Sequence, residues 1–250
     1  MFGGCSPDTC TGKPGHLCAP DVLEPGDDVT YALKVEKWEP KESTSGATNA
    51  SRKSTFPGFI PKTDEIRIQS APKLLKEILG RPHYITEKLD GTSFTAYSTE
   101  EGIEVCSRNQ TLREEDNAYW QVAKKYDLAT VLKDSSLAIQ GEVCGPGIQG
   151  NKLGLKEIDL FVFDIFDIPT ARYLNIEEVS EFCKKNNLKR VPLLLTGEAF
   201  NYSLEGLLEA AEGKYASGRE REGIVIRSND SSPRISFKVI SNKFLLKEEK

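Results

Sequence analysis

The sequence predicts an α+β fold, in which antiparallel strands form sheets and a few helices pack outside them. Runs of β-branched and aromatic residues recur from about residue 83 to residue 240 and are separated by turn residues. A few segments between them have helical periodicity. The 250 residues are 38% hydrophobic and 28% charged, which is typical of a globular protein with a sizeable core. No window reaches the roughly 18 apolar residues of a membrane span.

The first 60 residues lack such periodicity. Residues 1–24 are rich in Gly, Pro, Cys, Ser and Thr, and we interpret them as a disordered or remnant tail. Residues 25–60 contain a polar low-complexity run and predict a linker with at most one short helix around 29–35. The ordered domain, residues 61–250, is expected to begin near Phe59.

Half of the six cysteines crowd into the tail. Cys5, Cys10 and Cys18, with His16, could offer four zinc ligands, although their spacing contains no compact CxxC pair. A flexible tail without metal is the alternative. The other three cysteines lie in expected strands and a helix, where we interpret them as buried thiols.

The helices and strands of the ordered domain are predicted from hydrophobic periodicity and from the capping and turn residues that end them. Leu74, Leu75, Ile78 and Leu79 share one face of a helix that stops at Gly80. Asn175 is a helix cap, and Asp90-Gly91 is a strong hairpin signal between two strands. In chain order we predict a short strand or turn at 65–69, a helix at 71–79, strands at 83–88, 93–98 and 102–107, helices at 115–126 and 128–132, strands at 136–143 and 160–166, helices at 176–186 and 204–215, and strands at 223–227 and 234–240.

A lysine, Lys88, lies near the end of one of these strands. Lysines at such positions are usually solvated surface residues. Here, however, the sequence KLDG at 88–91 is followed by an ordered series of short motifs. They are SRN at 107–109, GE at 141–142, FVFD at 161–164, EGIVIR at 222–227 and FKV at 237–239. The ordered series resembles the motifs of covalent nucleotidyltransferases, the polynucleotide ligases and messenger-RNA capping enzymes.

This resemblance implies an α+β nucleotidyltransferase domain, the ATP-grasp-like adenylation domain of ligases, with antiparallel sheets flanked by helices. It also implies a three-step reaction. Lys88 attacks the α-phosphorus of ATP, the lysyl-AMP passes its adenylate to a 5′-phosphate, and a 3′-hydroxyl then displaces AMP. The attacking amine must be neutral, and burial or a nearby cation would lower its pKa.

The resemblance assigns catalytic roles to four residues. Asp90 orients Lys88 or holds a metal-bound water, with an ordinary turn aspartate as the alternative. Glu222 binds Mg²⁺ or Mn²⁺ through water. Lys238 contacts the α-phosphate and stabilises its developing charge. Many relatives carry a second lysine where this chain has Ile240, and Lys243 or Lys247 could substitute for it.

Other residues are expected to bind the nucleotide. The resemblance has Glu142 accept hydrogen bonds from the ribose hydroxyls and Arg108 contact ribose and phosphate, with a surface arginine as the alternative for Arg108. Phe163 would stack on adenine, although Phe161 lies on the same face of the strand. The remaining nucleotide contacts are assigned to Arg67, Glu87, Gly91, Val225 and Lys238.

The branch of the superfamily follows from what flanks the motifs. DNA ligases and capping enzymes carry a barrel domain after the last motif, whereas the chain stops a dozen residues after Lys238, so we expect an ATP-dependent RNA ligase. Residues 26–41 resemble the junction behind the N-terminal barrel of the Deinococcus and Naegleria RNA ligases, which predicts a truncated or reduced barrel. A DNA ligase or capping guanylyltransferase core without its barrel is the alternative; a non-catalytic module is disfavoured because every core motif position is filled.

Partners and location are expectations of the same kind. The net charge of −5 argues against a nucleic-acid coat protein and predicts weak, salt-sensitive binding to RNA at a nick or broken end. We expect an RNA-repair enzyme that is monomeric, intracellular and cytoplasmic, with no membrane partner.

Overall fold

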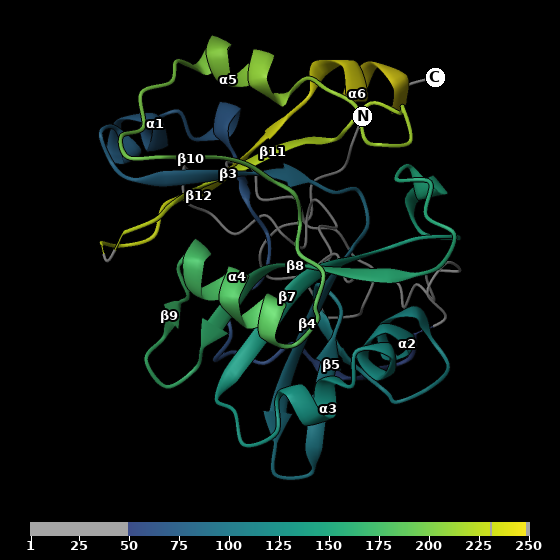
Figure 1. The fold of residues 1–250 in the computed structure, drawn as a ribbon. Coiled ribbons are helices and arrows are strands. Elements are labelled where there is room, and N and C mark those ends of the chain that lie inside the picture. Colours follow the sequence, from purple (N-terminus) through teal and green to yellow (C-terminus); the bar gives the residue numbers. More distant parts are fainter. Residues whose placement is uncertain (1–49, 231, 249–250) are drawn as a thin grey trace, which may run out of the picture. The chain divides into compact units, whose positions relative to one another are not determined.

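The computed structural model describes residues 50–230 and 232–248, which form two β-sheets with helices outside them. The seven-stranded sheet has the order β1-β6-β5-β4-β7-β8-β9, and the five-stranded sheet the order β10-β3-β11-β12-β2. In Figure 1 the five-stranded sheet, with α1, α5 and α6, lies above the seven-stranded sheet, with α2, α3 and α4. The predicted α+β fold is confirmed.

The strands are β1 (Arg52–Thr55), β2 (Ile66–Arg67), β3 (His83–Lys88), β4 (Thr92–Thr99), β5 (Gly102–Cys106), β6 (Gln110–Leu112), β7 (Leu137–Cys144), β8 (Asp159–Asp167), β9 (Arg172–Tyr173), β10 (Leu193–Gly197), β11 (Gly223–Ser228) and β12 (Ser236–Ile240). The helices are α1 (Lys73–Ile78), α2 (Ala118–Lys125), α3 (Leu128–Val131), α4 (Ile176–Lys185), α5 (Leu204–Ala211) and α6 (Asn242–Glu248), with short 3-10 turns at Ile68–Ser70 and Gln149–Asn151.

The predicted hairpin at Asp90-Gly91 is wrong. β3 pairs with β10 and β11 in the five-stranded sheet, whereas β4 pairs with β5 and β7 in the seven-stranded sheet. The dipeptide is therefore where the chain crosses from one sheet to the other. Gly91 is needed there for a close approach, because a Cβ would lie 2.5 Å from the carbonyl oxygen of Val143 and 2.6 Å from Cys144 Sγ.

Alternation along the five-stranded sheet separates its two faces. On β11, Ile224 and Ile226 belong to the apolar cluster that α1 and α5 cover, whereas Val225 and Arg227 point to the opposite face. On β12 Phe237 packs in the same cluster and its neighbour Lys238 faces the other way. One face is thus a core beneath helices and the other is free to carry polar groups.

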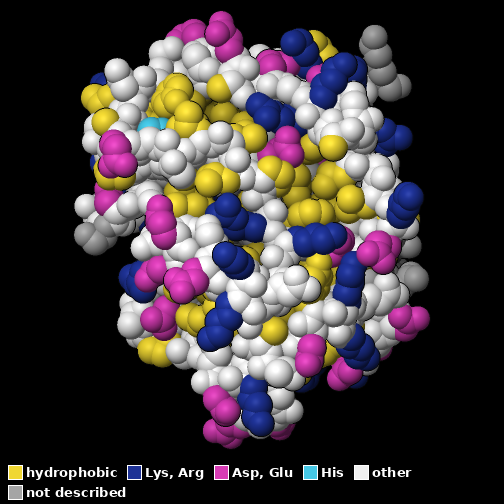
Figure 2. Space-filling view, in the orientation of Figure 1, with side chains coloured by type: hydrophobic (Ala, Val, Ile, Leu, Met, Phe, Trp, Pro, Cys, Tyr) yellow, Lys and Arg dark blue, Asp and Glu magenta, His cyan; other side chains and the backbone are white. Residues whose placement is uncertain are grey.

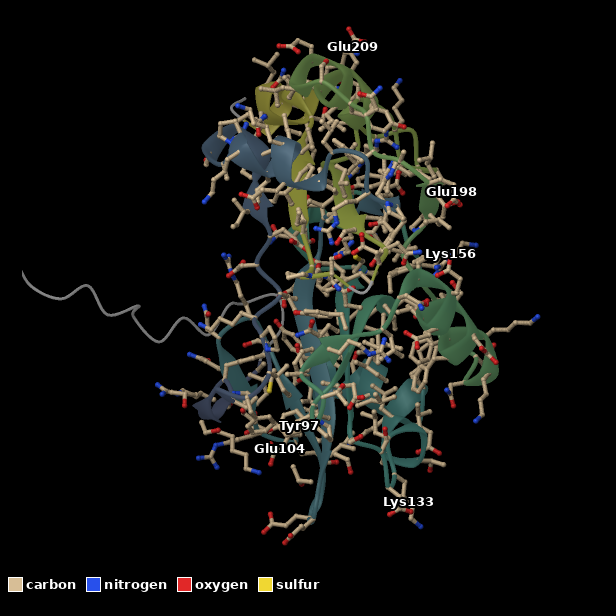
Figure 3. All side chains as sticks on the ribbon, turned by 90° about the vertical axis from the view of Figure 1, so that its left-hand side faces the viewer. Tyr97, Glu104, Lys133, Lys156, Glu198 and Glu209 are labelled. Carbon is tan, nitrogen blue, oxygen red and sulfur yellow. The ribbon has the colours of Figure 1, made fainter. Side chains whose placement is uncertain are left out.

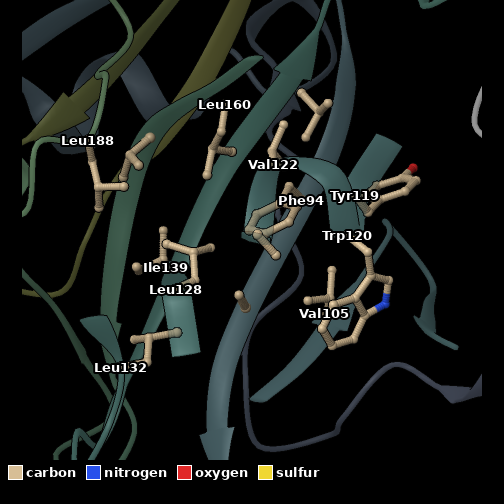
Figure 4. Packing of buried hydrophobic residues seen from close by; sticks show 14 of the residues in the cluster. Phe94, Val105, Tyr119, Trp120, Val122, Leu128, Leu132, Ile139, Leu160 and Leu188 are labelled. Atoms are coloured by element: carbon tan, nitrogen blue, oxygen red, sulfur yellow. The ribbon is translucent and has the colours of Figure 1, made fainter. Parts of the chain in front are cut away.

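The largest apolar cluster lies between the seven-stranded sheet and helices α2, α3 and α4 (Figure 4). Phe94, Val105, Ile139 and Leu160 contribute its sheet side, and each is fully buried. The segment before β2 covers part of the opposite face, where Phe59 packs edge-on against Tyr97 at 5.5 Å between ring centroids.

The three cysteines predicted to be buried thiols are Cys106, Cys144 and Cys183. All three are free and buried, which confirms that interpretation.

The ends of two helices have identifiable causes. Asn175 caps α4 as predicted, in a reciprocal capping box with Glu178. Helix α5 ends at Ala211, four residues earlier than predicted, because the guanidinium of Arg221 donates to the carbonyls of Ala210, Ala211 and Glu212 at its C-terminus.

Helix α1 keeps Ile78 buried, but Leu79 lies past its end and is 60% exposed, contrary to the predicted apolar face.

Five elements were not predicted. β1, β6, β9, β10 and α6 are short, and the strands among them lie at sheet edges or, for β6, next to one. All four residues of β1 are exposed, so hydrophobic alternation is absent, yet β1 pairs with β6 and the sheet begins before Phe59. The predicted tail, the helix around 29–35, the barrel junction at 26–41 and the zinc residues fall in 1–49 and lie outside the described residues.

Within residues 50–230 and 232–248, no helix is long and apolar enough to cross a membrane.

Replacing Gly91 by Ala should destabilise the fold. The added Cβ meets a backbone oxygen that cannot move without disturbing the pairing of β4 with β7, so a loss of about 1–3 kcal/mol in the free energy of unfolding is expected. Urea unfolding measures it. Gly58→Ala is the matched control, since no atom lies within 4 Å of its added Cβ. Equal stabilities for the two variants would contradict the close approach.

Candidate active site

A cavity of about 330 Å³ opens between the two sheets, facing the polar side of the five-stranded sheet. Its walls come from β3, β11 and β12 on one side and from β4, β7 and β8 on the other. Ten of the eleven residues predicted for the site line this cavity. They are Glu87, Lys88, Asp90, Gly91, Arg108, Glu142, Phe163, Glu222, Val225 and Lys238.

Lys88 and Glu222 form an ion pair, with Nζ donating to Oε2 at 2.7 Å. The pair is set by strand register, because Lys88 at the end of β3 lies opposite Gly223 at the start of β11. Burial lowers the pKa of Lys88, but the carboxylates of Glu222, Glu142 and Asp90 outweigh it and raise the pKa above its ordinary value. Lys88 is therefore an ammonium in this state, whereas the sequence argument expected a neutral amine.

Glu142, on β7, lines the cavity and is half-buried. Burial raises its pKa to about 7, although the Lys88 ammonium acts in the opposite direction. A backbone hydrogen bond from Gly91 also favours its ionised form. Glu142 thus keeps its proton to a higher pH than an ordinary glutamate does.

Asp90 is not a hairpin-turn residue. It lies in the crossing between the sheets and pairs with Lys152, whose Nζ is 2.7 Å from Oδ2. Lys152 comes from the loop after β7, and its Nζ also lies 4.3 Å from the ring centroid of Phe244 in α6. The carboxylate of Asp90 is thus fixed between Lys152 and the cavity.

Phe163 lines the cavity and Phe161 does not, although both rings pack against the cluster of Leu89, Cys144, Val191 and Tyr215. The register shifts between Gln140 and Gly141 of β7, which face Asp164 and Val162, so Phe163 is an extra residue in its strand. The Arg227 guanidinium lies 5.6 Å from its ring centroid. The geometry therefore separates two aromatics that alternation alone could not.

Three further predicted residues differ in their placement. Lys238 lines the cavity next to Val225 on the paired strand, and Arg108 lines it although 60% of its side chain is exposed and it pairs with Asp64 at 2.6 Å. Arg67 is aligned with Lys238 across β2 and β12, but its side chain donates to Gln69 and does not line the cavity.

Lys243 and Lys247 were considered as substitutes for the second lysine. They are about two-thirds exposed, pair with Glu212 and Glu220, and do not line the cavity.

Sequence reasoning missed several residues at this site. Arg227 is 2% exposed and pairs with Glu65 and Asp164, and together with Thr86 it forms a polar part of the cavity wall. Its position at the end of EGIVIR and its alternation with Val225 could have indicated this. No local pattern distinguished Lys152 or Tyr215, which reach the site from loops.

The carboxylates of the site are the ligand type that Mg²⁺ and Mn²⁺ prefer. Among the described residues no group of three or more His, Cys, Asp or Glu side chains is arranged to hold a metal ion directly. Asp90, Glu142 and Glu222 line the cavity and act electrostatically on one ammonium, and Asp90 and Glu222 are the two residues that the sequence predicts to hold a metal ion through water.

The visible surface carries basic and acidic side chains interspersed over both sheets, without one continuous basic patch (Figure 2). This agrees with the net charge of −5.

A family model described as RNA ligase matches residues 81–240. The structure is similar to Naegleria gruberi RNA ligase solved as a variant with ATP and Mn, at 38% identity and a TM-score of 0.77, covering 90% of this chain and 69% of that one. It is also similar to the same enzyme solved with PPi, at 39% identity and a TM-score of 0.77, covering 90% of this chain and 68% of that one.

A further variant of that enzyme, with AMP and Mn, matches at 38% identity and a TM-score of 0.77, with 90% and 68% coverage. No curated protein sequence gives a significant match. The family model covers more than half of the chain, and it spans Lys88, Glu142 and Lys238 on their strands and Glu222 directly before β11. The chain belongs to the RNA ligase family.

Proposed function

We propose that this chain is an ATP-dependent RNA ligase that joins 3′-hydroxyl and 5′-phosphate ends through a lysyl-AMP on Lys88 and an adenylated 5′ end. The observation that carries the proposal is the Lys88–Glu222 pair at 2.7 Å in a cavity that Glu142, Asp90 and Lys238 also line. The likeness to a ligase solved with ATP, AMP, PPi and Mn supports the nucleotide and the chemistry.

In the first step Lys88 Nζ attacks the α-phosphorus, a P–N bond forms, and the bond to pyrophosphate breaks. The amine must lose its proton first, and three carboxylates hold the charged form. A divalent cation, Mg²⁺ or Mn²⁺, held through water by Asp90 and Glu222 would supply the positive charge that offsets them. Lys238, which lines the same cavity, would contact the α-phosphate and stabilise its developing charge.

The remaining residues bind the nucleotide. Glu142 would accept from the ribose hydroxyls, Arg108 would contact ribose and phosphate, and Phe163 would stack on adenine in the cavity that Val225 also lines. Glu87 and Gly91 complete the wall. Arg67 donates from Nε to Gln69 and does not line the cavity, so the predicted contact with the nucleotide requires its side chain to move.

Lys88→Ala should abolish the covalent adduct without unfolding the protein, because it removes the attacking nitrogen. Intact-protein mass spectrometry after incubation with ATP and Mg²⁺ or Mn²⁺ measures the adenylate. Lys133→Ala is the control, since Lys133 is an exposed lysine at the end of the molecule away from the five-stranded sheet (Figure 3). It should retain the adduct in full.

The same assay separates the alternatives. An adduct with GTP and none with ATP would indicate a capping-type guanylyltransferase, and sealing of nicked DNA but not of nicked RNA would indicate a DNA ligase. The absence of any adduct on wild-type protein would overturn the proposed chemistry.

Glu142→Gln should raise stability at alkaline pH. The unfolded carboxyl ionises near 4.5 and the folded one near 7, so the folded state holds the extra proton and its stability falls as pH rises through this window. The amide removes that penalty, so we expect a gain of ~1–3 kcal/mol at pH 8 that disappears toward pH 4.5. Chemical unfolding of both proteins across this range measures it. A gain independent of pH would contradict the shift.

Phe163→Ala should raise the KM for ATP roughly 10-fold, because stacking of a base on an aromatic ring contributes about 1–3 kcal/mol. The kcat of adenylation should change less. Phe161→Ala is the matched control, since Phe161 is two residues away in the same strand but does not line the cavity. A larger rise of the KM for ATP in Phe161→Ala than in Phe163→Ala would show that Phe161, and not Phe163, stacks on the base.

A further inference from the structure

Tyr215 lies between the two residues of the central ion pair. It is 4% exposed and packs with Leu89, Cys144 and Val191. Its hydroxyl donates to the carbonyl oxygen of Lys88 at 2.8 Å and accepts from the backbone N–H of Glu222 at 3.0 Å. One oxygen atom thus bonds the backbone of both residues.

The bridge lies where the pairing of β3 with β11 ends. Lys88 and Gly223 are the last aligned residues of that ladder, and Glu222 lies just outside it. On its other side the Glu222 carbonyl accepts from the Ser241 N–H at 2.9 Å. A Cβ at Gly223 would overlap the carbonyl oxygen of Val239, so the backbone next to Glu222 is held against β12. The Tyr215 hydroxyl therefore completes the fixation of Glu222.

A short hairpin between α5 and β11 delivers the tyrosine. Tyr215 N–H donates to Arg219 at 2.9 Å, and Arg221 N–H donates to Gly213 at 3.0 Å. Ser217 Oγ donates to the carbonyl of Lys152 at 2.6 Å, which ties the hairpin to the loop whose lysine pairs with Asp90. The hairpin thus bonds the backbone of Lys88 and of Glu222, and it bonds Lys152, the ion-pair partner of Asp90.

We propose that Tyr215 is a positioning residue for adenylation, whose hydroxyl sets the separation at which the Glu222 carboxylate meets Lys88 Nζ. This inference rests on the proposed lysyl-AMP chemistry. Tyr215 does not line the cavity, so it acts through the backbone of its two partners and not on ATP. Small displacements of reacting groups change rates steeply, so loss of one hydroxyl should be measurable.

Tyr215→Phe keeps the ring and removes the bridge. In single-turnover adenylation of the full chain we expect the rate at saturating ATP to fall about 10- to 100-fold, with the KM for ATP within about 3-fold of wild type. Tyr126→Phe is the matched control, because Tyr126 also donates from its hydroxyl, to Asp159 at 2.5 Å, away from the cavity. Its rate should stay within about 3-fold of wild type.

A second readout does not depend on activity. The Glu222 N–H donates to the lost hydroxyl, so its hydrogen exchange should accelerate in Tyr215→Phe and remain unchanged in Tyr126→Phe. If Tyr215→Phe does not fold, Ser217→Ala, which releases the same hairpin from Lys152, should lower the adenylation rate about 3- to 10-fold.

The outcomes are distinct. If the wild-type protein forms an adduct but Tyr215→Phe matches Tyr126→Phe in adenylation rate and in hydrogen exchange, the positioning role alone is overturned. An adenylation rate of Ser217→Ala equal to that of the wild type would overturn it as well. If the wild-type protein forms no adduct, the proposed lysyl-AMP chemistry itself is contradicted.

Discussion

The ion pair between Lys88 and Glu222 is the contact on which the site depends. It joins two neighbouring strands at the edge of the cavity, and it leaves Glu142 and Asp90 close enough to add to the negative field around one ammonium. Such a cluster is costly to bury unless its charges are balanced. The positive charges of Lys238 and Lys152 supply part of that balance. The cavity therefore combines positive and negative groups, as binding of a polyanion together with a cation requires.

The fold makes this site possible because alternate residues of the same strand face the core and the cavity. On β11 and β12 every second side chain enters an apolar core beneath the helices, and the residues between them face the cavity. The chemistry-bearing groups are thus mounted on strands with a packed core directly behind them. That rigidity suits a nucleophile that must meet one phosphorus atom in line.

Much of the site could be predicted because the motifs recur in a fixed order along strands, and strand alternation carries Lys88, Glu142 and Lys238 to one space. What failed was pairing. Asp90-Gly91 has hairpin chemistry, but β3 finds its partners about 110 and 140 residues later, and local sequence contains no signal for such distant registers. Phe163 and Phe161 could not be distinguished from the sequence either, because both rings pack against one cluster and only their places along β8 differ.

The crossing at Asp90-Gly91 has a consequence for how this chain tolerates change in length. Lys88 closes one sheet and Thr92 opens the other, so only three residues span the gap. A single inserted residue there would shift the phase of every side chain after it on β4 or slide the nucleophile out of line with its partners. The connection between β8 and β9, whose residues 169–171 are exposed, lies outside this crossing, so we expect an inserted residue there to leave Lys88 and its partners in place.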